Sequence, residues 1–174
     1  MIRTYSTTIR RKEMDAVLTC MVDEKIGPGE MNARFIQSVK EFFKCDGAVA
    51  VRSPSIALKY AMKALGAESG TTVMISALAP SWQILALEEF GYTPLVLDVD
   101  EATALVTADI VSEGIKKGGH ILLLHETNGI MPDMDAIASL GIPVIEDISQ
   151  SVGSSAPVPE GTERTPAEAA RARA

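Results

Sequence analysis

The carboxylates Glu146 and Asp147 end the apolar segment Val144-Ile145, and the side-chain amide of Gln150 follows three residues after Asp147. A carboxylate at the end of an apolar strand can hold a cationic ring nitrogen in place, ligate Mg²⁺ or cap the next turn. The residues by themselves leave these three roles open.

A second candidate site is the start of an expected helix at Arg52-Ser53-Pro54-Ser55-Ile56. Serine is a favoured N-cap and proline suits the first helical position. The N–H groups of Ser55 and Ile56 would then face the positive end of the helix dipole, where anions bind. The Ser55 hydroxyl and the Arg52 guanidinium are possible further donors. The alternative is an ordinary, well-capped helix start.

A third candidate, His125-Glu126, follows the apolar segment 121–124. Neighbours on an extended segment point in opposite directions, and one histidine is too little to name a general base. The two cysteines show no metal spacing, so we predict no metal site. The chain also lacks G-x-S-x-G, P-loop and G-x-G-x-x-G motifs, the signatures of hydrolases, NTPases and dinucleotide-binding proteins.

All three candidates follow short apolar segments that read as strands. Such segments alternate with stretches of helical periodicity, which predicts an α/β fold with a mostly parallel sheet and flanking helices. Ligands of such sheets bind beyond the carboxyl ends of the strands, where the three candidates fall. We expect strands at 48–51, 72–75, 94–97, 120–124 and 143–146, and helices at 12–24, 31–44, 54–65, 81–90, 107–117 and 134–140.

The first two expected helices are amphipathic, with apolar residues at spacings of three and four. We expect both apolar faces to be buried. The residues on these faces are Met14, Val17, Leu18 and Met21 in the first helix, and Phe35, Val39, Phe42 and Phe43 in the second.

Composition limits the class of protein. The 174 residues are 47% hydrophobic with a net charge of −7, so we expect an ordered unit over 1–155 and no binding of nucleic acid or anionic membranes. Residues 156–174 contain almost nothing that could be buried and are expected to be disordered. No apolar run is long enough to cross a bilayer, and Cys20 and Cys45 fit buried free thiols, so we expect a soluble, cytoplasmic protein.

Taken in order, several motifs resemble the sugar-aminotransferase (DegT/StrS-like) family of fold-type I enzymes, which use pyridoxal phosphate (PLP). The resemblance covers nearly the whole chain up to about residue 155. It rests on Ile26-Gly27-Pro28-Gly29-Glu30, Ala48–Val51, Ala64-Leu65-Gly66, Phe90–Asp100, Asn128-Gly129, Asp133–Ile137 and Val144–Gln150.

The resemblance implies a role for each candidate. Asp147 would pair with the protonated pyridine nitrogen of PLP, and Gln150 would lie near the phenolic oxygen of its ring. The phosphate would lie at the helix start, where the family's Gly-Thr pair falls on Pro54-Ser55 and the cofactor contacts become Ser53, Ser55 and Ile56. Trp82 either stacks on the ring or packs in the core.

The sequence departs from the family pattern in four places. Pro54 removes one N–H donor to phosphate, and Pro80 stands where the family has its stacking aromatic. Glu126 aligns with a family histidine. No lysine follows Lys117, whereas the family's Schiff-base lysine lies beyond the Glu-Asp motif.

These departures predict an N-terminal part of an aminotransferase, with an incomplete large domain and no catalytic residue of its own. The whole enzyme would move an amino group from an amino-acid donor to a nucleotide-linked keto-sugar, in polysaccharide or natural-product biosynthesis. The chain would be inactive alone and would form a homodimer or join a complementing C-terminal polypeptide. Two alternatives are a non-catalytic interaction or regulatory protein that retains the fold, and an unrelated flavodoxin-like or phosphate-binding domain.

Overall fold

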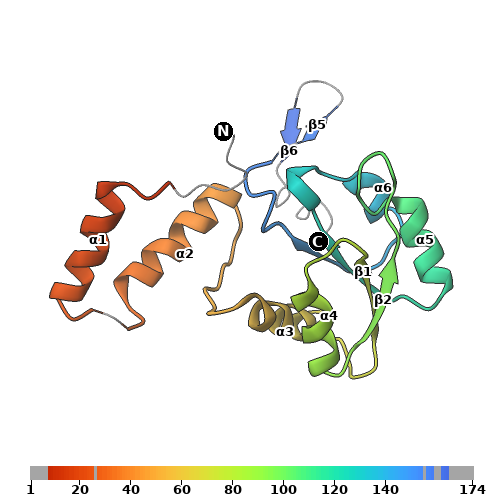
Figure 1. Cartoon of the computed structure of the whole chain (residues 1–174), viewed down its shortest axis with the longest axis horizontal. Coiled ribbons are helices and arrows are strands. Elements are labelled where there is room, and N and C mark those ends of the chain that lie inside the picture. The colour runs from red at the N-terminus through yellow and green to blue at the C-terminus, as the bar shows by residue number, and fades with distance from the viewer. Residues whose placement is uncertain (1–7, 26, 155, 159–161, 165–174) are drawn as a thin grey trace.

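The computed structural model describes residues 8–25, 27–154, 156–158 and 162–164 (Figure 1). Its centre is a parallel sheet in the order β2-β1-β3-β4. The predicted α/β class with a mostly parallel sheet and flanking helices is confirmed. The strands are β1 (Thr72–Ser76), β2 (Thr93–Leu97), β3 (Ile121–His125) and β4 (Val144–Asp147), and the flanking helices are α3 (Pro54–Ala64), α4 (Ser81–Glu89), α5 (Ala108–Lys116) and α6 (Met134–Ala138).

Each face of the sheet has its own core, because successive side chains of a strand point to opposite faces. Val73, Ile75, Ile121 and Leu123 pack with α3 and α4. On the other face, Met74, Leu122 and Leu124 pack with α5 and α6 (Figure 1). Strands buried on both faces read as continuous apolar runs, which is why their positions could be predicted.

The strand order reverses between β1 and β3. From β1 the chain goes to β2 on one side, and then crosses to β3 and β4 on the other. At such a switch point the loops leave the carboxyl ends of neighbouring strands in opposite directions, so a crevice can form between them. The residues that follow β1, β3 and β4 are therefore placed at one edge of the sheet.

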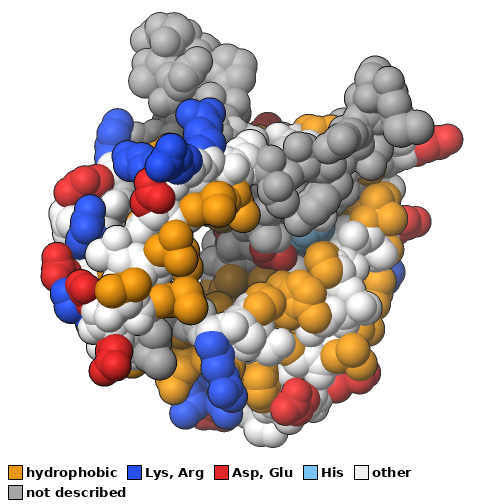
Figure 2. Space-filling model, turned by 60° about the vertical axis from the view of Figure 1, so that its left-hand side comes forward, with side chains coloured by type: hydrophobic (Ala, Val, Ile, Leu, Met, Phe, Trp, Pro, Cys, Tyr) orange, Lys and Arg blue, Asp and Glu red, His pale blue; other side chains and the backbone are white. Residues whose placement is uncertain are grey.

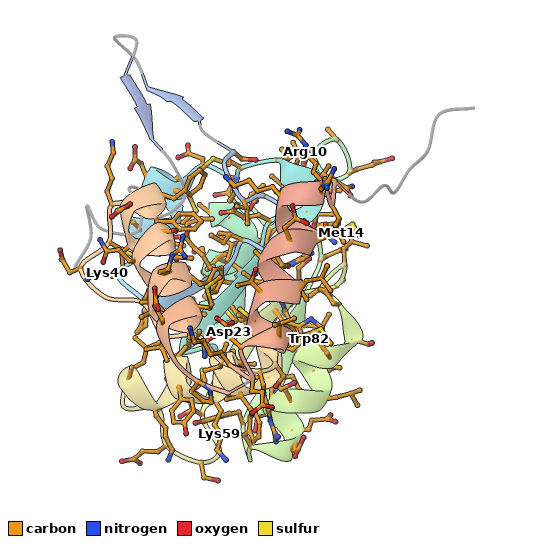
Figure 3. All side chains as sticks on the ribbon, turned by 90° about the vertical axis from the view of Figure 1, so that its left-hand side faces the viewer. Arg10, Met14, Asp23, Lys40, Lys59 and Trp82 are labelled. Atoms are coloured by element: carbon orange, nitrogen blue, oxygen red, sulfur yellow. The ribbon has the colours of Figure 1, made fainter. Side chains whose placement is uncertain are left out.

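Two further helices, α1 (Arg11–Val22) and α2 (Glu30–Phe43), lie side by side and stand apart from the sheet (Figures 1 and 3). The predicted helices are present, but the expectation that their apolar faces are buried is wrong. Leu18 is 54% exposed and Phe35 60%. Figure 2 shows hydrophobic side chains gathered around a hollow on this side of the molecule. None of the helices in the described ranges is long and apolar enough to cross a membrane.

The expected strand at 48–51 is also wrong. This segment has no regular secondary structure, and Val49 is 83% exposed. A strand needs a neighbour whose C=O groups accept its N–H groups and whose N–H groups donate to its C=O groups, and the segment lies instead along α3. The two together line an apolar hollow of about 440 Å³, formed by Val49, Val51, Ala57, Tyr60, Ala61 and Ala64.

Two smaller expectations also need adjustment. Cys20 and Cys45 are free, as predicted, but half-buried rather than buried. Within the segment expected to be disordered, β5 (Ala156–Val158) and β6 (Thr162–Arg164) pair as antiparallel strands. The rest of that prediction, for 159–161 and 165–174, lies outside the described residues.

Candidate functional site

Two polar side chains, one at the end of β3 and one on the helix after β1, meet at Asp147. In the register of β3 and β4, His125 stands beside Asp147, and its Nδ1 lies 3.1 Å from Asp147 Oδ2. Gln83, in the first turn of α4 just after β1, reaches the same oxygen with its Nε2 at 2.7 Å. The parallel topology thus brings together residues that are far apart in the sequence.

Asp147 is held as a carboxylate. Burial opposes its ionisation, but hydrogen bonds from Ser149 and His125 together outweigh that cost, and the pKa of Asp147 lies below its ordinary value. An ionised carboxylate can only accept hydrogen bonds, so the His125 Nδ1 must donate in this contact. The site therefore presents a negative charge, with 12% of the Asp147 side chain exposed.

The other oxygen of Asp147, Oδ1, accepts the backbone N–H of Ser149 at 3.1 Å. Of the three roles that the sequence left open for Asp147, capping of the following turn is thus present. The Ser149 side chain also hydrogen-bonds this carboxylate, so Ser149 contributes both a backbone and a side-chain donor. No cluster of three or more potential metal ligands occurs among the residues that the structure describes.

The loops after β3 and β4 are tied together by hydrogen bonds. Gln150 Oε1 accepts the backbone N–H of Asn128 at 2.9 Å, and the Ser154 hydroxyl donates to the Gly129 carbonyl at 3.0 Å. Asn128 and Gly129 both have positive φ, which turns the chain sharply at this point. These contacts fix Gln150 beside the end of β3.

Glu126 forms a third tie between the same loops. Its side chain is buried and its Oε2 pairs with the Ser151 hydroxyl, while its Oε1 is buried without a hydrogen-bond partner in the described part of the chain. Burial, reinforced by the nearby charge of Asp147, raises the pKa of Glu126 even though the Ser151 bond opposes the shift. The environments of Glu126 and Asp147 thus push their ionisation in opposite directions.

At the start of α3, one of the free backbone N–H groups is already bound by the side chain of the N-cap residue. The Ser53 hydroxyl accepts the N–H of Ile56 at 3.3 Å. The sequence placed this N–H among the donors to an anion, and in the structure it serves the cap instead. Pro54 has no N–H, so Ser55 is the remaining first-turn residue whose N–H has no helical carbonyl to meet.

Trp82 belongs to the core on the α3–α4 face of the sheet. It is half-buried and packs against the cluster that contains Leu58, Met62 and Leu87. Its place on α4 is labelled in Figure 3. Nearby, the Lys59 ammonium lies 5.1 Å from the centre of the Phe90 ring and links α3 to α4.

Comparison with known proteins shows the family. The model of the DegT/DnrJ/EryC1/StrS aminotransferase family matches residues 7–158. The chain belongs to this family. The match includes every candidate residue described above, from Ser53 to Gln150.

Several solved structures share the fold, and two of them are described as aminotransferases. Similar ones include TlmJ from Streptoalloteichus hindustanus (28% identity, TM-score 0.79, 90% of this chain and 44% of that one) and S. venezuelae DesV in complex with a ketimine intermediate (27%, 0.73, 82% and 40%). The aminotransferase from Psychrobacter cryohalolentis, at 24% identity, shows the same fold with a TM-score of 0.79 over 88% of this chain and 40% of that one. The chain thus spans less than half the length of these structures.

The residues present fit one end of PLP better than the other. The ionised carboxylate of Asp147, part of which is exposed, suits a protonated ring nitrogen. At the phosphate end, Ser55 offers its N–H and hydroxyl, while Ile56 is engaged by Ser53. In this family member, ring recognition is therefore better provided for than phosphate recognition.

Gln83 is the site residue that sequence reasoning missed. It is fully buried on a helix face that it shares with Ala86 and Leu87, three and four residues later. A polar residue at a core-facing position of a helix needs a buried partner, and this is the signal that could have pointed to it. The partner itself, Asp147, follows only from the fold.

Proposed function

We propose that this chain is the cofactor-binding N-terminal part of a PLP-dependent aminotransferase of the kind that aminates nucleotide-linked keto-sugars in polysaccharide or natural-product biosynthesis. The observation that carries the proposal is the ionised carboxylate of Asp147 at the end of β4, in a chain that the aminotransferase family model matches over residues 7–158. When bound, PLP supplies an electron sink that allows an amino group to pass from an amino-acid donor to a keto-sugar.

The roles of the chain's own residues follow from their contacts. Asp147 holds a negative charge against the ring nitrogen, and Gln150, fixed by the Asn128 N–H, is the residue for the phenolic oxygen of the ring. Ser53 and Ile56 close the start of α3, and Ser55 provides the remaining contact for phosphate. Trp82 keeps α4 packed on the sheet, which positions the loop after β1.

The chain is proposed to be inactive alone. Transamination needs a lysine amine that holds the cofactor and carries the substrate proton. The sequence contains no lysine after Lys117, and Lys59 is engaged with Phe90 on the flank of α3 and α4. We therefore propose that the amine is supplied by a lysine other than those of residues 1–174.

A partner chain is part of the proposal, either a second copy of this chain or a complementing C-terminal polypeptide. The apolar face of α1 and α2 and the apolar hollow between residues 48–51 and α3 both need cover. Within the described residues, β4 pairs on one side only, with β3, and so leaves an edge for a further strand. The free thiols of Cys20 and Cys45 support a cytoplasmic location.

One observation favours a second candidate, a non-catalytic interaction protein that keeps the fold. The Ser53 cap already occupies the Ile56 N–H, and Pro54 offers none, so the phosphate cradle is reduced. A protein of this kind would fold and assemble without affinity for PLP. The two candidates therefore differ in one measurable property.

PLP binding distinguishes them. Trp82 is the single tryptophan, so PLP bound near α4 quenches the intrinsic fluorescence of the chain. We expect saturable quenching that is lost in Asp147→Asn and kept in Asp133→Asn, which alters a carboxylate that only caps α6. Equal quenching in all three proteins, or none in the wild type, would reject the cofactor-binding proposal and leave the interaction protein.

A further inference from the structure

Gln83 is an amide in a place that otherwise takes apolar side chains. It is fully buried, and its helix neighbours Ala86 and Leu87 belong to the core. Its Nε2 donates to Asp147 Oδ2 at 2.7 Å, but its Oε1 is buried without a hydrogen-bond partner among the residues described. Burying the amide oxygen without a hydrogen-bond partner costs free energy of folding. Packing alone therefore does not explain a glutamine at this position.

The acceptor positions of Asp147 are nearly full. A carboxylate has about four, two on each oxygen. Oδ2 receives both Gln83 Nε2 and His125 Nδ1, and Oδ1 receives the N–H of Ser149. The Ser149 side chain is a further hydrogen-bond partner of the carboxylate. Oδ2 is thus full, and a ligand donor can be accepted only on Oδ1, where its competitors come from Ser149 alone.

We infer that Gln83 is a positioning residue that, with His125, closes Oδ2 of Asp147 and directs a cationic ring N–H to Oδ1, beside Ser149. The inference rests on the proposed function, because it assumes that Asp147 receives the cofactor ring. It adds which oxygen is used and which residue makes the choice. His125 alone cannot enforce that choice, because a single donor on Oδ2 leaves a second acceptor position open on that oxygen.

The chemistry of the amide suits this task. Gln83 donates a strong hydrogen bond to an anion without bringing a positive charge. A lysine or arginine at this position would cancel the charge of Asp147 and remove its attraction for a cation. With Gln83, the carboxylate is oriented while its charge remains available to the ligand.

The chain contains a matched control for this pair. Gln37 donates its Nε2 to Glu41 Oε1, also at 2.7 Å, but on the exposed surface of α2. The two pairs have the same donor, the same kind of acceptor and the same distance, and differ in burial. Gln83→Met and Gln37→Met therefore remove the same hydrogen bond with different expected consequences.

The test is NMR spectroscopy of the ¹⁵N-labelled chain without ligand. Its two histidines are the buried His125 and the exposed His120, so the protected ring N–H signal belongs to His125. In Gln83→Met, Asp147 Oδ2 accepts a hydrogen bond from His125 alone. That hydrogen bond should become stronger, so we expect the His125 Nδ1–H signal to move downfield. Gln37→Met should leave it unchanged. An unmoved signal in Gln83→Met would overturn the inference.

Adding PLP tests the choice of oxygen. In the wild type we expect PLP to shift the backbone amide of Ser149, which reports Oδ1, and to leave the His125 ring signal in place. In Gln83→Met both signals should respond, and PLP should bind about tenfold more weakly. A wild-type response at His125 without one at Ser149 would also overturn the inference.

The failure of the proposed function would look different. If PLP moves neither signal at any concentration, the cofactor assignment fails, while the ligand-free comparison still decides whether Gln83 and His125 share Oδ2. If Gln83→Met does not fold, Gln83→Asn replaces it, because the shorter amide keeps a polar side chain that is one methylene too short to reach Asp147.

Discussion

The helix pair α1–α2 and the α/β body both contain helices with apolar residues, but these residues are largely exposed on α1 and α2 and largely buried in the body. Leu18 on α1 is 54% exposed, whereas Leu87 on α4 is fully buried. Leu18 lies on the apolar side of α1, and Leu87 lies on the core-facing side of α4 beside Ala86. The difference shows that periodicity predicts a helix and its apolar face, but not the surface that will cover that face.

The body covers its own apolar faces because it has a sheet. Four strands present side chains to both sides, and α3 to α6 find a surface within the same chain (Figure 1). The pair α1–α2 has no such surface among the described residues and leaves Met14, Val17 and Phe35 in contact with solvent. The stability of the chain should therefore come from the body.

The largest expected effect tests this directly. Leu87→Ala leaves a cavity in the body and should lower the free energy of unfolding by about 2–5 kcal/mol. Leu18→Ala, the same change on α1, should stay within about 0.5 kcal/mol, because its side chain is already in contact with water. Urea unfolding followed by circular dichroism measures both.

The same experiment could contradict the expected difference in stability between the body and the helix pair. If Leu18→Ala costs as much as Leu87→Ala, the face of α1 is covered in solution. Repeating the measurement across a range of protein concentrations would then separate a second copy, whose effect depends on concentration, from packing within one chain.

The second expected effect is overpacking. A Cβ added to Gly114 in α5 would lie 2.5 Å from Met74 Sδ and 2.8 Å from Leu97 Cδ2. Gly114→Ala should therefore cost about 1–3 kcal/mol, reduced by the helix propensity that alanine gains. Gly47→Ala meets nothing within 4 Å, in the segment that joins α2 to the body, and serves as the control. Equal thermal stability of the two variants would show that Met74 yields without cost.

Much of the fold could be predicted because each element carried its own local signal. Buried parallel strands read as apolar runs, and α3 began at Ser53-Pro54 as its capping residues indicated. The segment 48–51 looked like such a strand and is not one. Apolar composition indicates that a segment favours burial between layers, whereas strand formation depends on a neighbouring edge elsewhere in the chain.

The site was predictable only in part. Asp147 and Gln150 were visible as polar residues after an apolar strand, and the parallel fold placed them at one edge of the sheet. The contacts of Asp147 with His125 and Gln83 depend on strand order and register, which no local pattern encodes. The capping of Ile56 by Ser53 was a competing use of the same groups, and only coordinates could decide it.

The third expected effect concerns that cap. Ser53→Ala removes the acceptor of the Ile56 N–H at the start of α3 and should cost about 1 kcal/mol. Ser38→Ala, an exposed change within α2, should cost less than about 0.5 kcal/mol. Thermal unfolding compares the two. A Ser53→Ala variant as stable as the wild type would mean that the N–H of Ile56 has another acceptor and that the cap does not compete with an anion.

The smallest expected effect appears only as a dependence on pH. Burial raises the pKa of Glu126, so this carboxyl favours the folded state while it is protonated in both states and loses that advantage as the pH rises above its ordinary value of 4.5. Glu126→Gln keeps a partner for Ser151 without a charge to bury. It should equal the wild type below that pH and become the more stable protein as the pH rises.

Asp147 changes the free energy of unfolding with pH in the opposite direction to Glu126. Its lowered pKa stabilises the fold above the ordinary value of 3.8 and ceases to do so as the pH falls through the lowered value. The difference between Glu126→Gln and the wild type reports Glu126 together with its coupling to the charge of Asp147, which is present in both proteins. Glu41→Gln on α2 is the control and should show no such divergence, since Glu41 lies on the exposed surface. A Glu126→Gln variant less stable than the wild type at neutral pH would mean that the ionised carboxylate holds the loops after β3 and β4 together.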